Sequence, residues 1–599
     1  VKTEYIYHYI SSADPYNWVK TKNTFTPVSG STLTSTETFE YLDGLGRPIQ
    51  TVKKAWSPSQ KDVVSAVLYD NQGRTIKQYT PFQTSASTGA FAAVPSNQPF
   101  SVTQYELSPL NRVSSITPPG WYTSSSTYGS NGSSEVGYFN GSSATSYYPA
   151  NSLTKTSVIA PQSSTRNIET VTYKDKKGRI VMMRRKEVEN AANKADTYTF
   201  YDNKDRVVMV LPPGVSTVAS DANLRFEYVY DAADHMTYKK VPDMNGITMK
   251  YNLLDQPVLT QDGNLQPSNK WILTKYDSYG RLVSSGIHTG ISPDPNSTTL
   301  SYSEQHSATT YGTSGVELGK VKTTQTWIPG FSTPITRTFT YSTVTGRMLS
   351  DYGNNHLSGS TGTDNYNYVY DYAGNTISQT RAHKSSSASS TLTLVTRSVY
   401  DHAGRNIALY HQINSNPEKH LAQFMYDYRD RLIDKGLGEF FIGESSSYLQ
   451  SIDYTYNEQS WLKAINGGSS FAALSQAPLS LCSTTPAIPD PAEASLAVNP
   501  DGNDIFKLNI YYDSVGFAFG SAPGQRNGNI AQIVWQTRGR ERQGYSLQYD
   551  YLDRLTTSYY ADINSSGSAT TDNKYEEDIT YADARGNINS IFFHYINRK

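Results

Sequence analysis

Aspartate and arginine recur at a fixed spacing along this chain of 599 residues, and both are residue types that can do chemistry. The clearest example is YDNQGR, which begins at Tyr69, and similar hexapeptides begin at Tyr276, Tyr370 and Tyr400. The residues at matching positions are Tyr69, Asp70, Gly73, Arg74, Tyr276, Asp277, Gly280, Arg281, Tyr370, Asp371, Gly374, Tyr400, Asp401, Gly404 and Arg405. Carboxylates on turns could bind calcium, but a calcium loop gathers several of them, whereas each copy here offers one carboxylate beside an arginine. We therefore expect turn-forming residues and no metal site.

The other residue types that support catalysis are not arranged for it. The ten histidines are scattered singly, and no HExxH zinc pattern occurs. Gly44-Leu45-Gly46 lacks the third glycine and the following helix of a phosphate-binding loop, so a hairpin turn explains it better. No G-x-S-x-G elbow is present, and no carboxylate pair stands apart from the turn aspartates as a glycosidase requires. The sequence predicts a protein that is not an enzyme and that has no cofactor.

The elements that position the aspartates are predicted to be β-hairpins. The residues on both sides of Asp70 alternate in strand fashion, over 65–69 before it and 75–79 after it. The Asp70 side chain can bond back to the backbone, and Gly73 can take the positive φ that closes the turn. The arginine that follows lies close enough to aromatic residues to cross a ring face, a contact worth roughly 0.5 to 2 kcal/mol. Some copies carry aspartate in place of the glycine, and aspartate tolerates left-handed backbone: Asp205, Asp430 and Asp553.

Looser copies of the hexapeptide fill the intervals along the chain. They begin at Tyr41, Tyr173, Tyr201, Tyr230, Tyr426, Tyr549 and Tyr581. Adjoining copies recur roughly every 20 to 30 residues, which is the range of stacked supersecondary units. No long stretch has helical periodicity, so the fold class is predicted to be all-β, with the hairpins joined in one continuous sheet.

The amino-acid composition and net charge limit the kinds of molecule that we expect this chain to bind. The 47 tyrosines, against 19 phenylalanines, suit sheet faces that partly contact water. The formal net charge is −1 and no long basic run occurs, so nucleic acid is not expected as a partner. No apolar run reaches the length of a membrane span, and the residues from Val1 do not resemble a signal peptide.

Two domains are predicted. Residues 1–165 form an N-terminal β domain that contains YLDGLGRP and a Ser/Gly-rich stretch, from Trp121 to about Ser164, that we expect to be a surface loop. Residues 166–599 form the repeat region, with an Ala/Pro-rich insertion at about 469–504 that contains the single cysteine, Cys482. The last repeat ends at Lys599 without a covering segment, so we expect more chain or another subunit to cover that edge.

The distributed Tyr-Asp…Gly-Arg copies resemble the rearrangement-hotspot (Rhs) or tyrosine–aspartate (YD) repeat family. YLDGLGRPIQTV at Tyr41 to Val52 looks like the N-terminal domain of a secreted bacterial group within that family. Three further stretches fit the same group: SWLKAING at 460–467, DIFKLNIYY at 504–512 and RNGNIAQIVWQT at 526–537. The resemblance implies a long antiparallel β-sheet of repeat hairpins that spirals into part of a hollow shell.

The resemblance also implies a function. In bacterial relatives the shell commonly encloses a C-terminal toxin, so the first hypothesis is a secreted or cell-surface structural protein that encloses or presents a toxin or other cargo, supplied by a downstream segment or a partner shell subunit. The second hypothesis is a surface adhesin or glycan-binding module whose outer aromatic residues and Ser/Thr-rich loops contact the ligand. Trp121, Trp271, Trp327 and Trp535 are candidates to stack on sugars, although packing in the core or between strands is the favoured use of these side chains. A polysaccharide-active enzyme is the weakest of the three because no carboxylate pair stands out.

Overall fold

The computed structural model describes residues 2–10, 15–24, 35–139, 145–214, 222–331, 333–357, 361–442, 445–467, 504–571, 574–582 and 586–594. Within these ranges the regular structure is β-strand, apart from three short 3-10 helices, η1 (Ala222–Leu224), η2 (Gln266–Ser268) and η3 (Gly315–Glu317). Apart from Asp504, the predicted insertion with Cys482 lies outside the described residues.

The strands follow one another as short antiparallel hairpins. The first group is β1 (Lys2–His8), β2 (Asn17–Thr24), β3 (Ser35–Leu42), β4 (Pro48–Lys53), β5 (Val63–Tyr69), β6 (Thr75–Tyr79), β7 (Phe82–Gln83), β8 (Phe100–Tyr105), β9 (Val113–Thr117), β10 (Ser124–Ser130), β11 (Gly137–Phe139), β12 (Thr145–Tyr147), β13 (Thr154–Pro161), β14 (Asn167–Lys174), β15 (Ile180–Glu187) and β16 (Lys194–Tyr201). The second group is β17 (Val207–Leu211), β18 (Phe226–Tyr230), β19 (Met236–Lys240), β20 (Ile247–Tyr251), β21 (Pro257–Gln261), β22 (Lys270–Tyr276), β23 (Leu282–Thr289), β24 (Glu304–Tyr311), β25 (Val321–Thr326), β26 (Ile335–Tyr341), β27 (Met348–Asn354), β28 (Thr363–Tyr370) and β29 (Thr376–Lys384). The third group is β30 (Leu392–Tyr400), β31 (Asn406–Ile413), β32 (Lys419–Tyr426), β33 (Leu432–Ile442), β34 (Ser445–Tyr456), β35 (Leu462–Ile465), β36 (Phe506–Tyr511), β37 (Gln532–Thr537), β38 (Arg542–Tyr549), β39 (Leu555–Ile563), β40 (Ala569–Thr570), β41 (Glu577–Tyr581) and β42 (Ile588–Phe593).

Forty of these strands belong to one sheet, which confirms the predicted all-β fold. With few exceptions each strand pairs antiparallel with the next, as β5 does with β6 and β28 with β29. The register shifts at the tyrosine that precedes a turn, for instance between Leu68 and Tyr69 and between Val399 and Tyr400. Such a β-bulge bends and twists the strand that carries it, and its repetition at one end of many hairpins favours a curved sheet.

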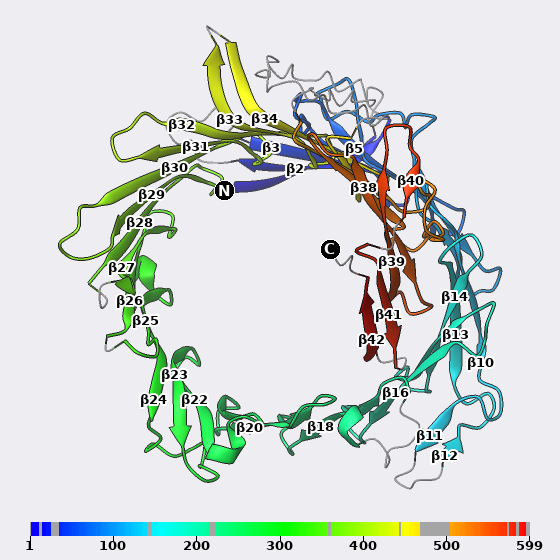
Figure 1. The fold of residues 1–599 in the computed structure, drawn as a ribbon, viewed down its shortest axis with the longest axis horizontal. Coiled ribbons are helices and arrows are strands. Elements are labelled where there is room, and N and C mark those ends of the chain that lie inside the picture. The colour runs from blue at the N-terminus through cyan, green and yellow to red at the C-terminus, as the bar shows by residue number, and fades with distance from the viewer. Residues whose placement is uncertain are drawn as a thin grey trace, which may run out of the picture.

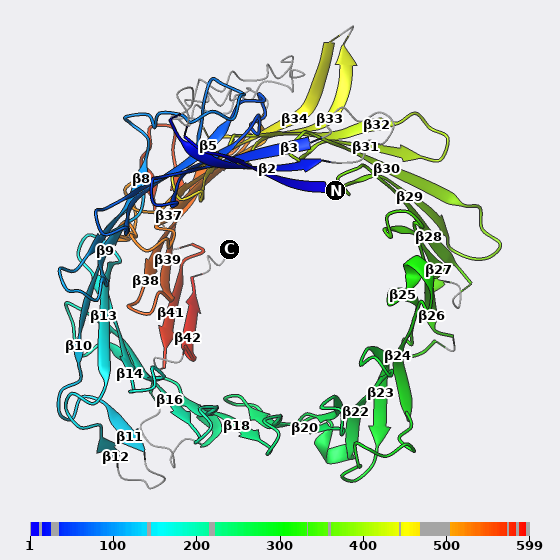
Figure 2. The same cartoon turned by 180° about the vertical axis from the view of Figure 1, so that it is seen from behind.

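The sheet curves into a ring (Figures 1 and 2). The strands from β18 to β23 form the side of the ring opposite the two ends of the chain. The later strands, β34 to β39, return beside the early strands β3 to β14, and the final hairpin of β41 and β42 lies on the inner side of the wall in both views. The protein is therefore a single spiral of sheet whose two ends overlap.

The buried residues form local clusters rather than one central core. One cluster contains Phe39, Tyr41, Val52, Val64 and Phe82. Three others gather around Met182, Leu259 and Val534. This distribution suits a curved sheet whose faces are covered in places by its own loops, because among the described residues the only other sheet is the two-stranded β11–β12 hairpin.

The Ser/Gly-rich stretch after Trp121 differs from the predicted surface loop. It contains the strands β10 and β13, which pair with each other, and the small hairpin β11–β12. Val136 and Leu153 are buried against Tyr173 of β14. Serine and threonine can occupy the water-facing positions of a strand, so the polar composition hid the few apolar anchors that fix this segment.

The sheet runs across residue 165 without interruption, because β13 pairs with β14 from Thr154 opposite Lys174 to Pro161 opposite Asn167. The division into domains at 165 remains a prediction. No helix in the described part of the chain is long and apolar enough to cross a membrane.

Candidate functional site

The repeated turn is built around one aspartate side chain. Asp70 follows the last residue of β5, and its Oδ1 accepts hydrogen bonds from the backbone N–H groups of Gln72 and Arg74, each at 2.9 Å. Its Oδ2 accepts a bond from Arg74 Nε at 2.7 Å. The carboxylate thereby closes the turn and fixes the arginine that begins the return strand. We call this arrangement a clasp.

The other copies singled out from the sequence have the same geometry. Asp277 and Asp401 each accept two backbone bonds and one arginine Nε bond, from Arg281 and Arg405 respectively. The copy at Tyr370 has Asn375 in place of arginine, and Asn375 Nδ2 donates to Asp371 Oδ2 at 2.9 Å. The sequence-predicted residues thus lie together within each turn, and the turns follow one another along the sheet.

Each clasp requires a left-handed residue just before the arginine. The glycine φ angles are 83° at Gly73, 79° at Gly280, 107° at Gly374 and 79° at Gly404. Where aspartate replaces glycine the backbone is the same, with φ angles of 66°, 63° and 64° at Asp205, Asp430 and Asp553. The turn therefore selects residues that tolerate positive φ.

Successive clasps are joined through their tyrosines. Tyr426 O–H, for example, donates to the carbonyl of Asn406 at 2.9 Å, and Asn406 directly follows Arg405 of the preceding clasp. The guanidinium of Arg405 lies over the Tyr426 ring, 5.6 Å from its centroid. The same pair of contacts joins Arg47 to Tyr69, Arg74 to Tyr105, Arg179 to Tyr201, Arg206 to Tyr230, Arg281 to Tyr311 and Arg554 to Tyr581.

These contacts give the tyrosine a specific role. The ring covers the arginine of the clasp before it, while the hydroxyl donates to the backbone carbonyl of the residue that follows that arginine. The abundance of tyrosine over phenylalanine follows from this double use.

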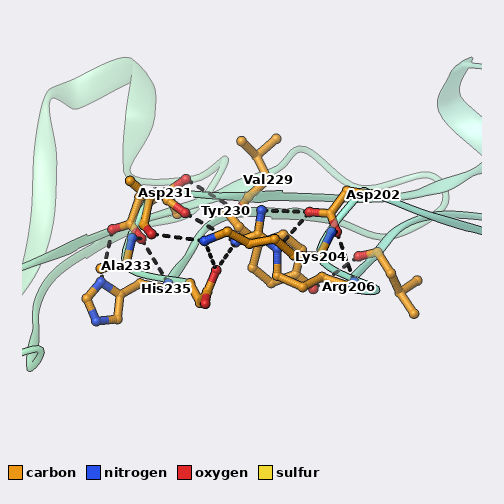
Figure 3. Close-up of polar contacts among 12 residues, drawn as sticks. Asp202, Lys204, Arg206, Val229, Tyr230, Asp231, Ala233 and His235 are labelled. Carbon is orange, nitrogen blue, oxygen red and sulfur yellow. Dashed lines mark hydrogen bonds and ion pairs between the residues drawn. The ribbon is translucent and has the colours of Figure 1, made fainter.

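Aspartate at the glycine position adds an ionic link that the sequence did not reveal. In the turn after β18, Asp234 Oδ1 accepts from Lys204 Nζ at 2.7 Å and also contacts Arg206 of the preceding clasp (Figure 3). Asp430 receives Arg405 Nη1 at 2.7 Å in the same way. Each such aspartate ties its own turn to the turn before it.

The bonds of the turn favour the ionised carboxylate at Asp70, Asp277 and Glu106. Hydrogen bonds from the Arg74 backbone and side chain lower the pKa of Asp70 below its ordinary value of 3.8. At Asp277, partial burial acts to raise the pKa, but the bonds from Arg281 outweigh it and the pKa is lowered. At Glu106, the side-chain bonds from Arg112 lower the pKa to about 2.

Several clasps escaped the sequence analysis because their first residue is not aspartate. Asn252 accepts the N–H groups of Leu254 and Gln256, and Asn457 accepts those of Gln459 and Trp461. Glu106 and Ser342 begin two further turns. A tyrosine followed by any short side-chain acceptor, or by glutamate, was the signal that could have found them.

A second set of contacts closes the ring where the two ends of the sheet overlap. The Trp121 indole donates to the carbonyl of Arg526 at 3.1 Å and packs edge-on against Trp461, with ring centroids 5.1 Å apart. Arg526 lies over the Tyr122 ring, 4.1 Å from its centroid. Gln459 Nε2 donates to the carbonyl of Pro119 at 2.6 Å. We call the overlap of residues 56–194 with residues 402–553 the seam.

Residues at or beside the clasp turns of the late strands contact loops and strands of the early part of the chain along the seam. Arg166 Nη1 donates to the carbonyl of Tyr549 at 2.8 Å, and Arg185 pairs with Asp553. Arg429 Nη2 donates to Thr80 Oγ1 at 3.2 Å. Trp121 was predicted to lie in a surface loop, and its position here corrects that expectation.

The described residues include no group of three or more His, Cys, Asp or Glu side chains that could hold a metal ion. Of the tryptophans considered for glycan contact, Trp271 is buried at 4% exposure, and Trp535 stacks on Tyr545 with centroids 5.6 Å apart. Both indoles, like that of Trp121, pack within the protein.

Comparison with known proteins identifies structures with a similar fold. A family model described as a domain of unknown function, DUF6443, matches residues 17–135. No curated protein matches the chain. The crystal structure of TcdB2-TccC3-TEV superimposes with a TM-score of 0.55 at 12% sequence identity, over 95% of this chain and 27% of that one. The Tc holotoxin pore of Photorhabdus luminescens gives a TM-score of 0.55 at 12% identity, over 98% of this chain and 29% of that one.

The chain shares the β-sheet fold of these two Tc toxin structures. The similarity at 12% identity concerns the fold alone, and the chain spans less than a third of the length of either structure. The predicted architecture, a long antiparallel sheet of repeat hairpins that curves around an interior, agrees with both matches.

Proposed function

We propose that this chain is a non-enzymatic structural wall of an Rhs-type β-shell, outside the cell or on its surface, that encloses or presents a toxin or other cargo. The shape of the sheet is then its function. The clasps stiffen the wall, and the seam holds the two ends of the spiral together. The fold shared with the two Tc structures supports the proposal, because this chain aligns with them over nearly its whole length.

The observation that carries the proposal is the position of the last hairpin. β41 and β42 lie on the inner side of the ring (Figures 1 and 2), where Ile588 and Phe592 are 53% and 60% exposed. β42 pairs on one side with β41, where Ile588 lies opposite Tyr581 and Phe592 lies opposite Asp578. An apolar strand edge inside a ring suits an extended cargo segment that pairs with it.

Binding of an unfolded polypeptide tests the proposal directly. The probe is reduced, carboxymethylated lactalbumin, and its association with the full chain is measured by fluorescence anisotropy. We expect saturable binding that falls about tenfold or more in an Ile588→Asp, Phe592→Asp double variant, because two apolar contacts are replaced by charges. A matched control carries Leu253→Asp and Leu254→Asp, which change two exposed apolar residues on the turn between β20 and β21.

The outcomes separate the two functional hypotheses. Loss of binding in the β42 variant with retention in the turn variant supports cargo enclosure. Equal loss in both variants means that the probe binds exposed apolar surface in general. Absence of probe binding, combined with saturable binding on a glycan array, replaces the proposal with the adhesin hypothesis.

A further inference from the structure

A cavity of about 340 Å³ lies at one end of the seam. One side is formed by the start of β3 and the loop after β4, and the other by the turn after β30. The lining residues are Ser35, Thr36, Glu37, Lys54, Ala55, Trp56, Gln60 and His402. We infer that this cavity binds a small anion, either a free phosphate or sulfate ion or a molecule that carries such a group. This inference does not depend on what the shell encloses.

Three lysines beside the cavity converge on a single carboxylate, that of Glu37. Lys54 Nζ lies 3.0 Å from its Oε2, and the Nζ atoms of Lys20 and Lys22 lie 3.7 Å and 4.0 Å from its Oε1. Screening by water is limited, because side-chain exposure is 16% at Glu37 and 20% at Lys20. Burial acts to raise the pKa of Glu37, but the bond from Lys54 and the charges of the lysines outweigh it, and the pKa is lowered. The described residues give these lysines no second carboxylate partner, so two of the three ammonium groups have no counterion.

The other charged groups nearby leave this surplus in place. Lys53 Nζ lies over the Trp56 ring, 4.9 Å from its centroid. The Trp56 indole Nε1 lies 3.5 Å from Asp430 Oδ2 across the seam. Asp430 and the clasp residue Asp401 share one cation, Arg405, so this group carries one negative charge, which Lys53 balances. An anion in the cavity therefore supplies the charge that its wall lacks.

The loop after β4 is held in a fixed shape by a buried aspartate. Asp62 is 1% exposed, and its two carboxylate oxygens accept from the N–H groups of Ala55 at 2.8 Å and Gly89 at 2.7 Å. Lys61 precedes Asp62, so these two residues add no net charge. Ala55 and Gln60 have φ angles of 50° and 56°, which residues other than glycine rarely adopt. Such residues persist where the surrounding structure fixes them, and they cluster at ligand-binding sites.

The cavity also offers hydrogen-bond donors suited to an anion. His402 Nε2 is buried and has no hydrogen-bond partner in the described part of the chain. A buried nitrogen without a partner costs free energy, and a ligand oxygen satisfies it when the ring carries its proton on Nε2. The side chains of Ser35, Thr36 and Gln60 supply neutral donors. Lysine ammonium groups act as separate point charges, so several of them from different strands suit a tetrahedral anion better than a planar carboxylate.

Isothermal titration calorimetry of the full chain tests the site with inorganic phosphate, glucose 6-phosphate and glucose. Both phosphates should bind saturably and compete with sulfate, whereas glucose should not bind. A higher NaCl concentration should weaken the binding of both phosphates, because salt screens the attraction between the charges. Tighter binding of glucose 6-phosphate than of inorganic phosphate identifies an organic ligand, and equal binding identifies the free ion.

Two variants and a matched control make the assignment specific. Lys54→Gln should weaken phosphate binding about two- to fivefold, because one partly exposed charge is lost. Glu37→Gln should strengthen binding by a similar factor, because Lys54 is then free to meet the anion, and a purely structural role of Glu37 predicts no such gain. The control is Lys322→Gln, since Lys322 pairs with Glu317 at 3.2 Å away from the cavity, and phosphate affinity should not change.

Circular dichroism of each variant checks that the sheet is retained. A wild-type chain that binds neither phosphate saturably, or that binds glucose as tightly as its phosphate, overturns the inference. Equal weakening by Lys54→Gln and Lys322→Gln, or weaker binding in a folded Glu37→Gln variant, overturns it as well.

Discussion

At the scale of single residues, the clasp explains why four residue types recur together. The aspartate supplies two oxygens that accept three hydrogen bonds. The third residue after the aspartate has positive φ, and the arginine that follows it donates to the carboxylate. The tyrosine of the next repeat covers that arginine. The aspartates in place of glycine show that this position requires a residue that tolerates positive φ. They also show that a carboxylate at this position gains an additional partner. Both properties can be tested at Gly73, where a Cβ would meet Arg47 Nη1 at 2.6 Å.

The loss of stability on substitution of Gly73 should depend on the chemistry of the new side chain and not on its size alone. Gly73→Val is expected to lower the free energy of unfolding by about 1 to 3 kcal/mol, because a β-branched residue resists a φ of 83°. Gly73→Asp is the matched control and should cost less, since aspartate tolerates that φ and its carboxylate can pair with Arg47 as Asp205 pairs with Arg179. Chemical unfolding of the two variants measures the difference, and equal losses would contradict the account.

The tyrosine hydroxyl should contribute separately from the ring. Tyr426→Phe keeps the ring over Arg405 but removes the bond to the carbonyl of Asn406, so a loss of about 0.5 to 1.5 kcal/mol is expected. Tyr279→Phe is the control, because Tyr279 is exposed on a turn and stability should not change. A similar result for both variants would mean that the hydroxyl bonds do not stabilise the sheet.

At the scale of the hairpin, the clasp carboxylates make the repeats sensitive to acid. The pKa of Asp43 is lowered chiefly by the side-chain bond from Arg47, and that of Asp70 by the backbone bond from Arg74. A lowered folded-state pKa gives stability that is present above the ordinary value of 3.8 and is lost as the pH falls through the folded value. The free energy of unfolding, followed by tryptophan fluorescence, should therefore begin to fall as the pH drops below 3.8. If stability were constant down to pH 2, the ionised clasps would have no energetic role.

The sequence was a good guide to the hairpins and a poor guide to what joins them. Turn residues such as Asp70 and Gly73 act within a few positions, so their spacing predicts local structure directly. The contact between Arg405 and Tyr426 links adjacent repeats, and the sequence indicated an arginine–ring contact without identifying the ring. The strands around Trp121 were missed because a half-exposed strand tolerates serine and threonine, and composition alone does not show which few residues are buried.

At the scale of the whole molecule, the seam is the feature that sequence reasoning could not reach. Its contacts join residues hundreds of positions apart, such as Trp121 with Trp461 and Arg166 with Tyr549. They depend on the curvature summed over every bulge between them, and no single motif specifies that curvature. The seam converts a long strip of hairpins into a ring.

Trp121→Ala should therefore weaken the closure of the ring and not the nearby hairpin alone. The expected loss is on the order of 1 to 3 kcal/mol, because a half-buried indole and its bond to the Arg526 carbonyl are removed. Limited proteolysis should cut faster in both halves of the seam, around Trp121 and around residues 457–463. The exposed Leu110 provides a control, since Leu110→Ala should leave both regions protected. Faster cleavage near Trp121 alone would contradict a closing role.

The enclosure of cargo is tested most directly by locating a reporter in single-particle electron cryomicroscopy of the full chain. A compact reporter domain is fused after Lys599 in one protein and, as a control, inserted after Asn416 in another, in the loop between β31 and β32 that points away from the ring (Figure 1). The account predicts additional density inside the ring beside β41 and β42 for the first protein, and outside the wall for the second. Density outside the ring in both proteins would contradict the proposal that the interior of this sheet holds cargo.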